Sequence, residues 1–142
     1  MLFTTKSINQ DLEEVLTLLK QVNLPIEGVK EHFKNFFVTK EDKTIVGCVG
    51  LEIYEEVGLL RSIALQPSFQ GKGLGEQMVS KIETYSVENR INKIYLLTET
   101  AEKFFLKLGY RIIPREETDP RIKQSNEFTT ICPSSPVMMK SL

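Results

Sequence analysis

Apolar residues recur along this chain with two different periods, and the change of period divides it into strands and helices. Short apolar runs and alternating segments predict strands at residues 2–6, 36–40, 44–54, 58–66, 93–97, 110–113 and 137–139. Apolar residues three or four apart predict helices over about 9–22, 28–33, 74–85 and 101–108, with Asn9 as the first N-cap and a short helix after Pro120. No repeat, low-complexity tract or linker interrupts this order, so we expect one domain over residues 1–142.

The strand predicted at residues 44–54 carries a carboxylate among apolar side chains. Strict alternation assigns one face to Ile45, Gly47, Val49, Leu51 and Ile53, and the other to Val46, Cys48, Gly50, Glu52 and Tyr54. Glu52 is therefore expected inside a buried strand, where an ionised group needs a partner or a function.

Composition narrows the classes of function. The 142 residues are 41% hydrophobic, and the formal net charge is −1 at pH 7. That balance, with no basic run, argues against a nucleic-acid surface. No apolar stretch approaches the length of a membrane span, and residues 1–6 do not read as a signal peptide. We therefore expect a cytoplasmic globular protein that binds neither nucleic acid nor membrane.

The two cysteines, Cys48 and Cys132, are too few and too far apart for a metal set or a disulfide framework. We therefore expect reduced thiols and no bound metal. No histidine accompanies Cys48, which favours a small buried residue over a nucleophile.

The stretch from Gly58 to Tyr85 joins an apolar strand to an amphipathic helix through a glycine-rich loop. Pro67 ends the strand because proline cannot donate to a sheet ladder. The loop reads Gln70-Gly71-Lys72-Gly73-Leu74-Gly75, with its glycines where the helix begins. Backbone N–H groups in a first helical turn lack partners inside the helix, and glycines let an anion approach them. The stretch predicts a phosphate or pyrophosphate site with Lys72 at its rim; a glycine-rich turn without a ligand is the alternative.

Two common phosphate-binding patterns do not fit this loop. A P-loop requires Ser or Thr after Gly-Lys, where this chain has Gly73. A dinucleotide fingerprint requires a third glycine where this chain has Glu76 or Met78, depending on the register. The pattern Gln/Arg-x-x-Gly-x-Gly/Ala does fit, at residues 70–75. In this the loop resembles the coenzyme A loop of the GNAT superfamily of N-acetyltransferases.

A second motif carries the same resemblance. Residues 101–110, Ala-Glu-Lys-Phe-Phe-Leu-Lys-Leu-Gly-Tyr, are similar to the superfamily pattern Ala-x-x-aromatic-Tyr-x-x-x-Gly-Phe/Tyr. The resemblance implies the α/β (α+β) GNAT fold, with a mixed, mostly antiparallel, twisted sheet of six to seven strands flanked by about four helices. Shorter motifs are similar to the branch of arsenic-resistance and amino-acid N-acetyltransferases, at residues 50–52, 59–62, 97–102, 127–128 and 132–133.

The resemblance implies acetyl-CoA as the cofactor, with direct attack of a small molecule's amine on its thioester. Backbone amides of Ile63 and Leu65, on either side of Ala64, would bind the pantetheine arm and the thioester oxygen. Loop amides of residues 70–75 would hold the pyrophosphate. None of these roles requires a particular side chain.

Two positions depart from the superfamily's usual residues. Phe105 stands where many members carry a tyrosine that protonates the departing thiolate, and Leu59 stands where many carry a glutamate. Phe104 and Phe105 are expected to belong to the core and to pack against the cofactor. The acid and the base must therefore be other groups or water.

Four side chains are candidates for chemistry or for acceptor binding. Glu52 is the first candidate for proton transfer, and an ion-paired carboxylate is its alternative. Arg61, next to Ser62, suits a carboxylate on the acceptor, and a structural ion pair with Glu52 or Glu99 is the alternative. Glu99 either contacts the substrate or places a favourable charge at a helix start.

Two classes of function follow from these features. The first is an acetyl-CoA-dependent N-acetyltransferase that acts on an amino acid or an analogue of one. The second is a non-catalytic acyl-CoA-binding or regulatory domain on the same fold, which the residues at positions 59 and 105 favour. The sequence leaves the oligomeric state open, with a homodimer as one alternative.

Overall fold

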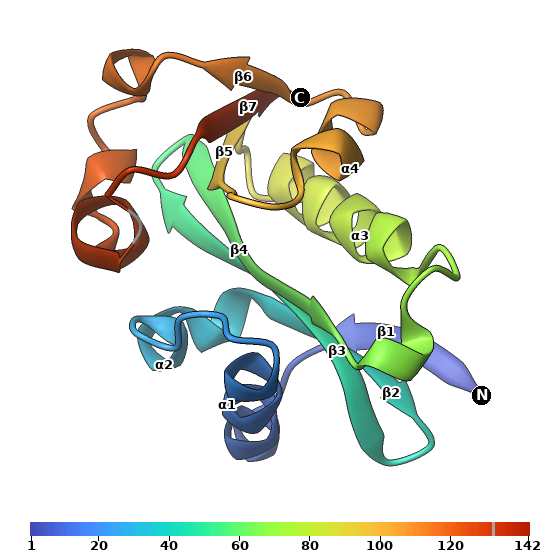
Figure 1. Cartoon of the computed structure of the whole chain (residues 1–142). Helices are drawn as coiled ribbons and strands as arrows, with labels where there is room; N and C mark the ends of the chain where they lie inside the picture. The colour runs from blue at the N-terminus through green and yellow to red at the C-terminus, as the bar shows by residue number, and fades with distance from the viewer. Residues whose placement is uncertain (132) are drawn as a thin grey trace.

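The computed structural model describes residues 1–131 and 133–142, and its strands form one sheet in the order β1-β2-β3-β4-β5-β7-β6 (Figure 1). The strands are β1 (Leu2–Lys6), β2 (Phe36–Glu41), β3 (Thr44–Tyr54), β4 (Val57–Leu65), β5 (Lys93–Leu97), β6 (Arg111–Ile113) and β7 (Val137–Ser141). Neighbouring strands are antiparallel except for the parallel pair of β4 and β5. The predicted mixed, mostly antiparallel sheet is confirmed.

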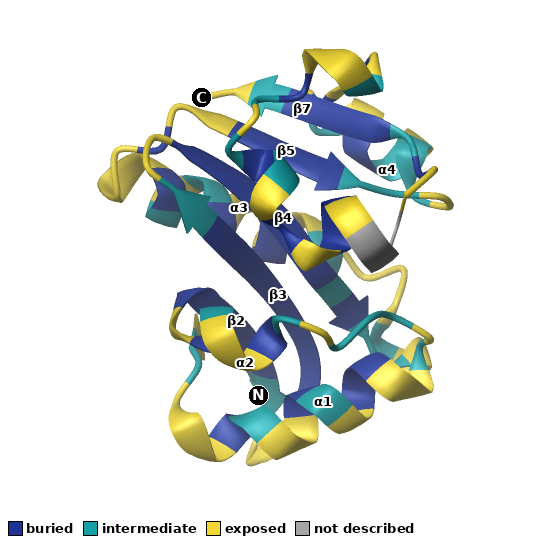
Figure 2. Ribbon diagram, turned by 90° about the vertical axis from the view of Figure 1, so that its left-hand side faces the viewer, coloured by how far each residue is buried: buried dark blue, intermediate teal, exposed yellow. Residues whose placement is uncertain are grey.

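Helices cover both faces of this sheet (Figure 1). On one face lie α3 (Leu74–Glu88) and α4 (Glu102–Lys107), and on the other lie α1 (Leu12–Gln21) and α2 (Val29–His32). Short turns complete the chain: 3₁₀ turns at Asn9–Asp11, Phe33–Asn35, Pro67–Phe69, Arg115–Glu117 and Ile122–Gln124, and a π-helical turn at Glu127–Ile131. Figure 2 shows the central strands buried along most of their length, with the outer sides of the helices exposed.

The C-terminal turns act as a further cover for the sheet. Ile122 and Phe128 are buried against Leu59 of β4 and Tyr95 of β5, on the face that α1 and α2 also occupy. Leu60, the next residue along β4, packs with the core beneath α3 and α4. One face of the sheet is therefore covered by two separate groups of elements, with β4 passing beneath both.

The start of the first helix differs from the prediction. Asn9 does not cap it; the backbone N–H of Ile8 instead donates to the Asp11 carboxylate at 2.9 Å, and Asn9 opens a 3₁₀ turn. The Lys40 ammonium lies 3.2 Å from the same carboxylate, which is buried. A carboxylate paired with a cation, such as that of Asp11, accepts a hydrogen bond from a backbone N–H more strongly than the neutral side-chain amide of Asn9 would.

The strict alternation predicted for β3 is wrong at its first residues. Thr39 of β2 pairs with Gly47, but the next residue, Lys40, pairs with Ile45, so one extra residue of β3 bulges out. Ile45 consequently packs with the core beneath α1, while Val49 and Leu51 pack beneath α3. A bulge reverses the faces of the residues before it, and alternation alone does not reveal it.

The fourth strand has a bulge of its own and then leaves its neighbour. Ser62 has a backbone φ of 58°, and the register of β3 with β4 shifts by one residue there. The parallel ladder with β5 is limited to residues 57–59 of β4 and residues 93–95 of β5. Beyond it the two strands diverge (Figure 1), so residues 60–65 turn one backbone edge toward a gap in the sheet.

Two further features bear on the expectations from composition. Cys48 has a free thiol that is fully buried, and burial raises its pKa to about 12. Cys132 lies outside the described residues. In the part of the chain that the structure describes, no helix combines the length and the apolarity that crossing a bilayer requires.

The close approach of β2 to β3 gives a test of the packing. A Cβ atom on Gly50 would lie 2.3 Å from ring carbons of Phe36, its fully buried partner across the ladder. Gly50→Ala should therefore lower the free energy of unfolding by about 1–3 kcal/mol, measured by urea denaturation. In a double-mutant cycle, Phe36→Leu should relieve much of that loss; strictly additive effects would contradict this account.

Candidate functional site

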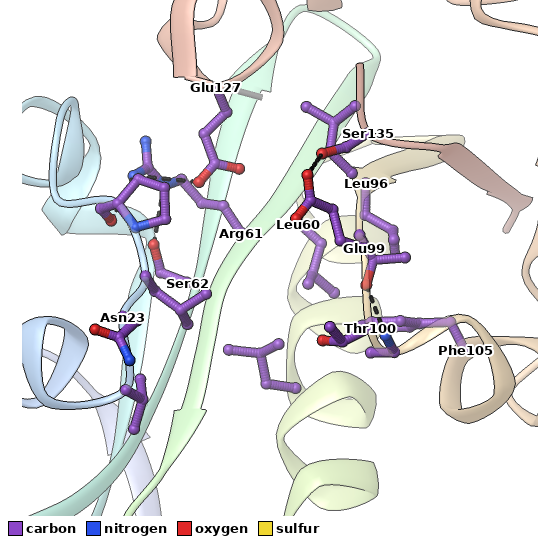
Figure 3. A pocket seen from close by; sticks show the side chains of 17 residues that line it. Asn23, Leu60, Arg61, Ser62, Leu96, Glu99, Thr100, Phe105, Glu127 and Ser135 are labelled. Atoms are coloured by element: carbon purple, nitrogen blue, oxygen red, sulfur yellow. Dashed lines mark hydrogen bonds and ion pairs between the residues drawn. The ribbon is translucent and has the colours of Figure 1, made fainter. Parts of the chain in front are cut away.

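Two connected hollows lie along the gap between β4 and β5. The first, here called the central cavity, has a volume of about 510 Å³ and is bounded by residues 22–25, 60–63, 96–101 and 105, together with Glu127 and Ser135 (Figure 3). The second, here called the loop groove, runs along the glycine loop. The two share Ile63, Thr100, Ala101 and Phe105, so a molecule bound in one meets a molecule bound in the other.

The loop groove ends at the first turn of α3. Gly73 precedes this helix with φ of 82°, and Gly71 has φ of 78°. A Cβ atom on either residue would meet no protein atom within 4 Å, so both backbones face open space. Among the residues that the structure describes, no side chain caps α3, whose first backbone bond runs from the Gln77 N–H to the Gly73 carbonyl. The helix therefore presents free N–H groups and the positive end of its dipole to the groove, which suits a phosphate.

The structure places most of the predicted cofactor residues along this groove. Its lining includes Ile63, Ala64, Leu65, Gln70, Gly71, Gly73, Gly75, Phe104 and Phe105. Lys72 and Leu74 are not part of the lining: the Lys72 ammonium lies 5.5 Å from the centre of the Phe69 ring, and the Leu74 side chain is buried. The Gln70 side chain donates to the Leu65 carbonyl at 3.1 Å, which ties the loop to the end of β4.

Two aromatic rings of α4 line the loop groove. Phe104 and Phe105 meet edge to face, with ring centroids 5.0 Å apart. Phe105 is buried against Tyr110, whose hydroxyl donates to Glu83 at 2.9 Å. The helix of residues 102–107 therefore offers the groove an apolar wall.

Arg61 lies at the centre of a buried network of charges. Its Nη1 lies 2.7 Å from Oε2 of Glu52, and its Nε donates to the Ser62 hydroxyl at 2.9 Å. Its Nη2 lies 3.5 Å from both the Pro25 carbonyl and Oε2 of Glu127. The Arg61 side chain has no exposed surface. The structural alternative foreseen for Arg61, a pair with Glu52, is thus present in the fold.

Glu52 is not brought to either hollow. Beyond Arg61, its carboxylate accepts a 2.5 Å hydrogen bond from the Tyr54 hydroxyl and lies 3.7 Å from Nε2 of His32. Burial and the bond to Glu52 raise the pKa of Tyr54, which keeps this donor protonated. Of the two alternatives foreseen for Glu52, proton transfer and an ion-paired carboxylate, the ion pair is present in the structure, and Glu52 is not among the residues that line either hollow.

Glu127 is the site residue that the sequence did not single out. It belongs to the π-helical turn, and its side chain is 8% exposed while lining the central cavity opposite Glu99 (Figure 3). Burial raises its pKa to about 7; the negative charges of Glu52 and Glu27 act in the same direction, while Arg61 opposes them. The sequence marks it only as part of the short motif at residues 127–128, in a segment without clear periodicity.

The remaining predicted residues also reach the central cavity. Ser62 lines it and accepts the bond from Arg61. Glu99 lines the opposite side, is exposed, and accepts a 3.1 Å hydrogen bond from the Ser135 hydroxyl. Residues 1–131 and 133–142 contain no group of three His, Cys, Asp or Glu side chains arranged to hold a metal ion. With this arrangement, an elongated anionic molecule bound in the loop groove would contact a small polar molecule bound in the central cavity.

Comparison with known proteins identifies the family to which these features correspond. The model of the acetyltransferase (GNAT) family matches residues 6–110. An uncharacterised N-acetyltransferase of Chlorobaculum tepidum is 32% identical over 92 residues, which are 64% of this chain and 59% of that protein. An amino-acid acetyltransferase of Ralstonia nicotianae is 33% identical over 78 residues, which are 54% of this chain and 17% of that protein. The chain thus spans only part of the length of these relatives.

Solved structures share the fold. N-acetylglutamate synthase from Neisseria gonorrhoeae, complexed with coenzyme A and N-acetyl-glutamate, superposes with a TM-score of 0.87 at 16% identity, over 100% of this chain and 35% of that one. The PaiA N-acetyltransferase from Thermoplasma acidophilum, in complex with coenzyme A, gives a TM-score of 0.73 at 16% identity, over 100% and 99% of the two chains. The predicted fold is confirmed by this likeness.

The buried network predicts how the protein responds to loss of its guanidinium. Arg61→Gln leaves the Glu52 carboxylate buried without its cation, so the free energy of unfolding should fall by about 3–5 kcal/mol in urea denaturation. Arg121→Gln is the matched control, because Arg121 pairs with Asp119 and Glu56 at the surface and its loss should cost much less. Equal losses for the two variants would show that burial of Arg61 does not matter.

Proposed function

Because this chain belongs to the acetyltransferase (GNAT) family, we propose that it is an N-acetyltransferase that transfers the acetyl group of acetyl-CoA to the amine of a small molecule. One observation carries the proposal: the loop groove and the central cavity meet at Ile63, Thr100, Ala101 and Phe105. A donor in the groove and an acceptor in the cavity then react directly in one ternary complex.

The loop groove fits the donor. Free N–H groups at the start of α3 suit a pyrophosphate, and Gly71 and Gly73 leave room for it. The unpaired edge of β4 at residues 60–65 offers backbone groups to an amide-containing arm that runs from the loop toward the cavity. The pantetheine arm and the thioester would follow that edge. The backbone N–H groups of Ile63 and Leu65 would be their hydrogen-bond donors, as expected from the sequence.

The central cavity fits the acceptor. Bringing an amine beside a thioester supplies much of the rate enhancement, because both reactants are held at the point where the hollows join. The nitrogen attacks the thioester carbonyl carbon, a C–N bond forms, the C–S bond breaks, and coenzyme A leaves as a thiolate. Phe105 carries no proton to give, so the thiolate takes its proton from water or from a neighbouring hydroxyl.

An amino acid or a close analogue is the acceptor that we propose. Support comes from the relatives named amino-acid acetyltransferase and from the gonococcal synthase solved with N-acetyl-glutamate. We assign Arg61 a structural role, because Glu52, Ser62 and Glu127 already surround its guanidinium. The cytoplasmic location and the homodimer stay predictions from the sequence.

Binding of coenzyme A tests the role of the loop. Gly73→Asn places a side chain in the open space while tolerating the left-handed backbone, so it should weaken coenzyme A binding roughly ten- to hundredfold in calorimetry through lost phosphate contacts. Gly109→Asn makes the same exchange at φ of 95°, after α4 and outside the groove, and should leave the affinity unchanged. Unchanged affinity in a folded Gly73→Asn protein would remove the loop from the donor site.

Acceptor turnover tests the reaction itself. We expect release of free coenzyme A from acetyl-CoA in a screen of the twenty amino acids, arsenical and phosphinic amino-acid analogues, alkylamines, polyamines and aminoglycosides. Amino acids or their analogues should give the highest kcat/KM. Tight binding of coenzyme A without release for any amine would instead establish the non-catalytic acyl-CoA-binding domain.

A further inference from the structure

Glu127 lines the cavity in which the acceptor of the proposed reaction would bind. We infer that the Glu127 carboxylate is the base that takes a proton from the acceptor's ammonium group. The inference rests on the proposed function, because it assigns a residue to that reaction. It replaces Glu52, which the sequence favoured for the same step.

Elimination among the cavity's own side chains carries the first part of the argument. The ionisable groups in the described lining are Arg61, Glu99 and Glu127. An arginine is not deprotonated in proteins, so it cannot accept a proton. Glu99 is exposed to water, and its carboxylate accepts a hydrogen bond from Ser135. Glu127 alone of the three combines a carboxylate with burial, at 8% exposure of its side chain.

The surroundings of Glu127 explain why it can both hold and release a proton. Arg61 is 2.7 Å from Glu52 but 3.5 Å from Glu127, so its attraction to Glu127 is the weaker of the two. The charged or titratable side chains on the elements around Glu127 are Glu27 before α2, His32 on α2, Glu52 and Tyr54 on β3, Arg61 on β4 and Arg115 near Phe128. Burial outweighs the cation, and with a pKa of about 7 the carboxylate is half ionised near neutral pH. A base poised near the working pH is the efficient choice for this step.

The proton balance is complete without another reactant. The acceptor's ammonium gives one proton to Glu127, and its neutral nitrogen then attacks the thioester carbonyl carbon. As the C–N bond forms and the C–S bond breaks, the second N–H proton leaves to water and water protonates the thiolate. Glu127 returns its proton to solvent, which restores the carboxylate for the next cycle.

Carboxyl carbon NMR tests the protonation state without any acceptor. In protein labelled with ¹³Cδ-glutamate, one resonance should titrate with a midpoint near pH 7 and disappear in Glu127→Gln. Glu116→Gln is the control, because Glu116 is an exposed carboxylate of the same C-terminal segment and its removal should leave that resonance in place. A Glu127 resonance that titrates in the ordinary carboxyl range would overturn the inference.

Kinetics with the best acceptor of the screen tests the catalytic role. For wild type, the acidic limb of kcat/KM should have its midpoint near pH 7 and should stay there when related acceptors of different amine pKa are compared. Glu127→Gln should lose that limb and about 10²- to 10⁴-fold in kcat, while Glu127→Asp should recover part of the rate. Glu116→Gln should behave as wild type.

The outcomes separate this inference from the function on which it rests. Calorimetry with coenzyme A shows whether Glu127→Gln is folded, since the loop groove does not include residue 127. Wild-type turnover with an acidic limb that persists in Glu127→Gln, or that follows the amine pKa, would overturn the inference and leave the N-acetyltransferase intact. Absence of turnover with every amine would overturn the proposed function, and this role with it.

Discussion

The contacts of the Arg61 guanidinium hold the segments of the site together. It contacts β3 through Glu52, the segment after α1 through the Pro25 carbonyl, and the C-terminal π turn through Glu127. The segment after α1 and the π turn cover one face of the sheet as separate groups, and within the described residues no backbone ladder joins these two segments to each other. A buried ion pair adds little net stability, but removing one partner is costly, so the network fixes the positions of the segments around the central cavity.

Because β4 diverges from β5, the two halves of β4 have different neighbours. Near its start β4 is an ordinary central strand, paired on both edges through residues 57–59. After the bulge at Ser62 it keeps β3 on one edge and leaves the other edge free, then leads into the glycine loop before α3. In the proposed function, one continuous piece of backbone would therefore position both the phosphates and the reactive end of the donor, which would limit their relative movement.

Local signals in the sequence predicted most of the helices and strands and the glycine loop before α3. The glycine spacing at residues 70–75 and the helical period after it depend only on neighbouring residues, and the structure has the loop and α3 there. The β3 bulge, by contrast, is set by its pairing with β2, and the Asp11 cap depends on Lys40 from a distant strand. Glu127 could not be placed for the same reason: its burial comes from segments that fold over it, and its own segment has no period to read.

The different surroundings of Glu52 and Glu127 explain why Glu52, the carboxylate that is more conspicuous in the sequence, is the weaker candidate for the base. A carboxylate in a regular buried strand must be satisfied by the fold itself, and Glu52 is, by Arg61, Tyr54 and the nearby His32. Each partner that stabilises the ionised carboxylate also occupies an oxygen lone pair that could otherwise accept a proton from a substrate. Glu127 shares the same cation at a longer distance and lies on a short turn at the cavity wall, so its carboxylate borders the space that a substrate would occupy. A carboxylate at a cavity wall, unlike one enclosed by partners within a strand, has the access that taking a substrate's proton requires.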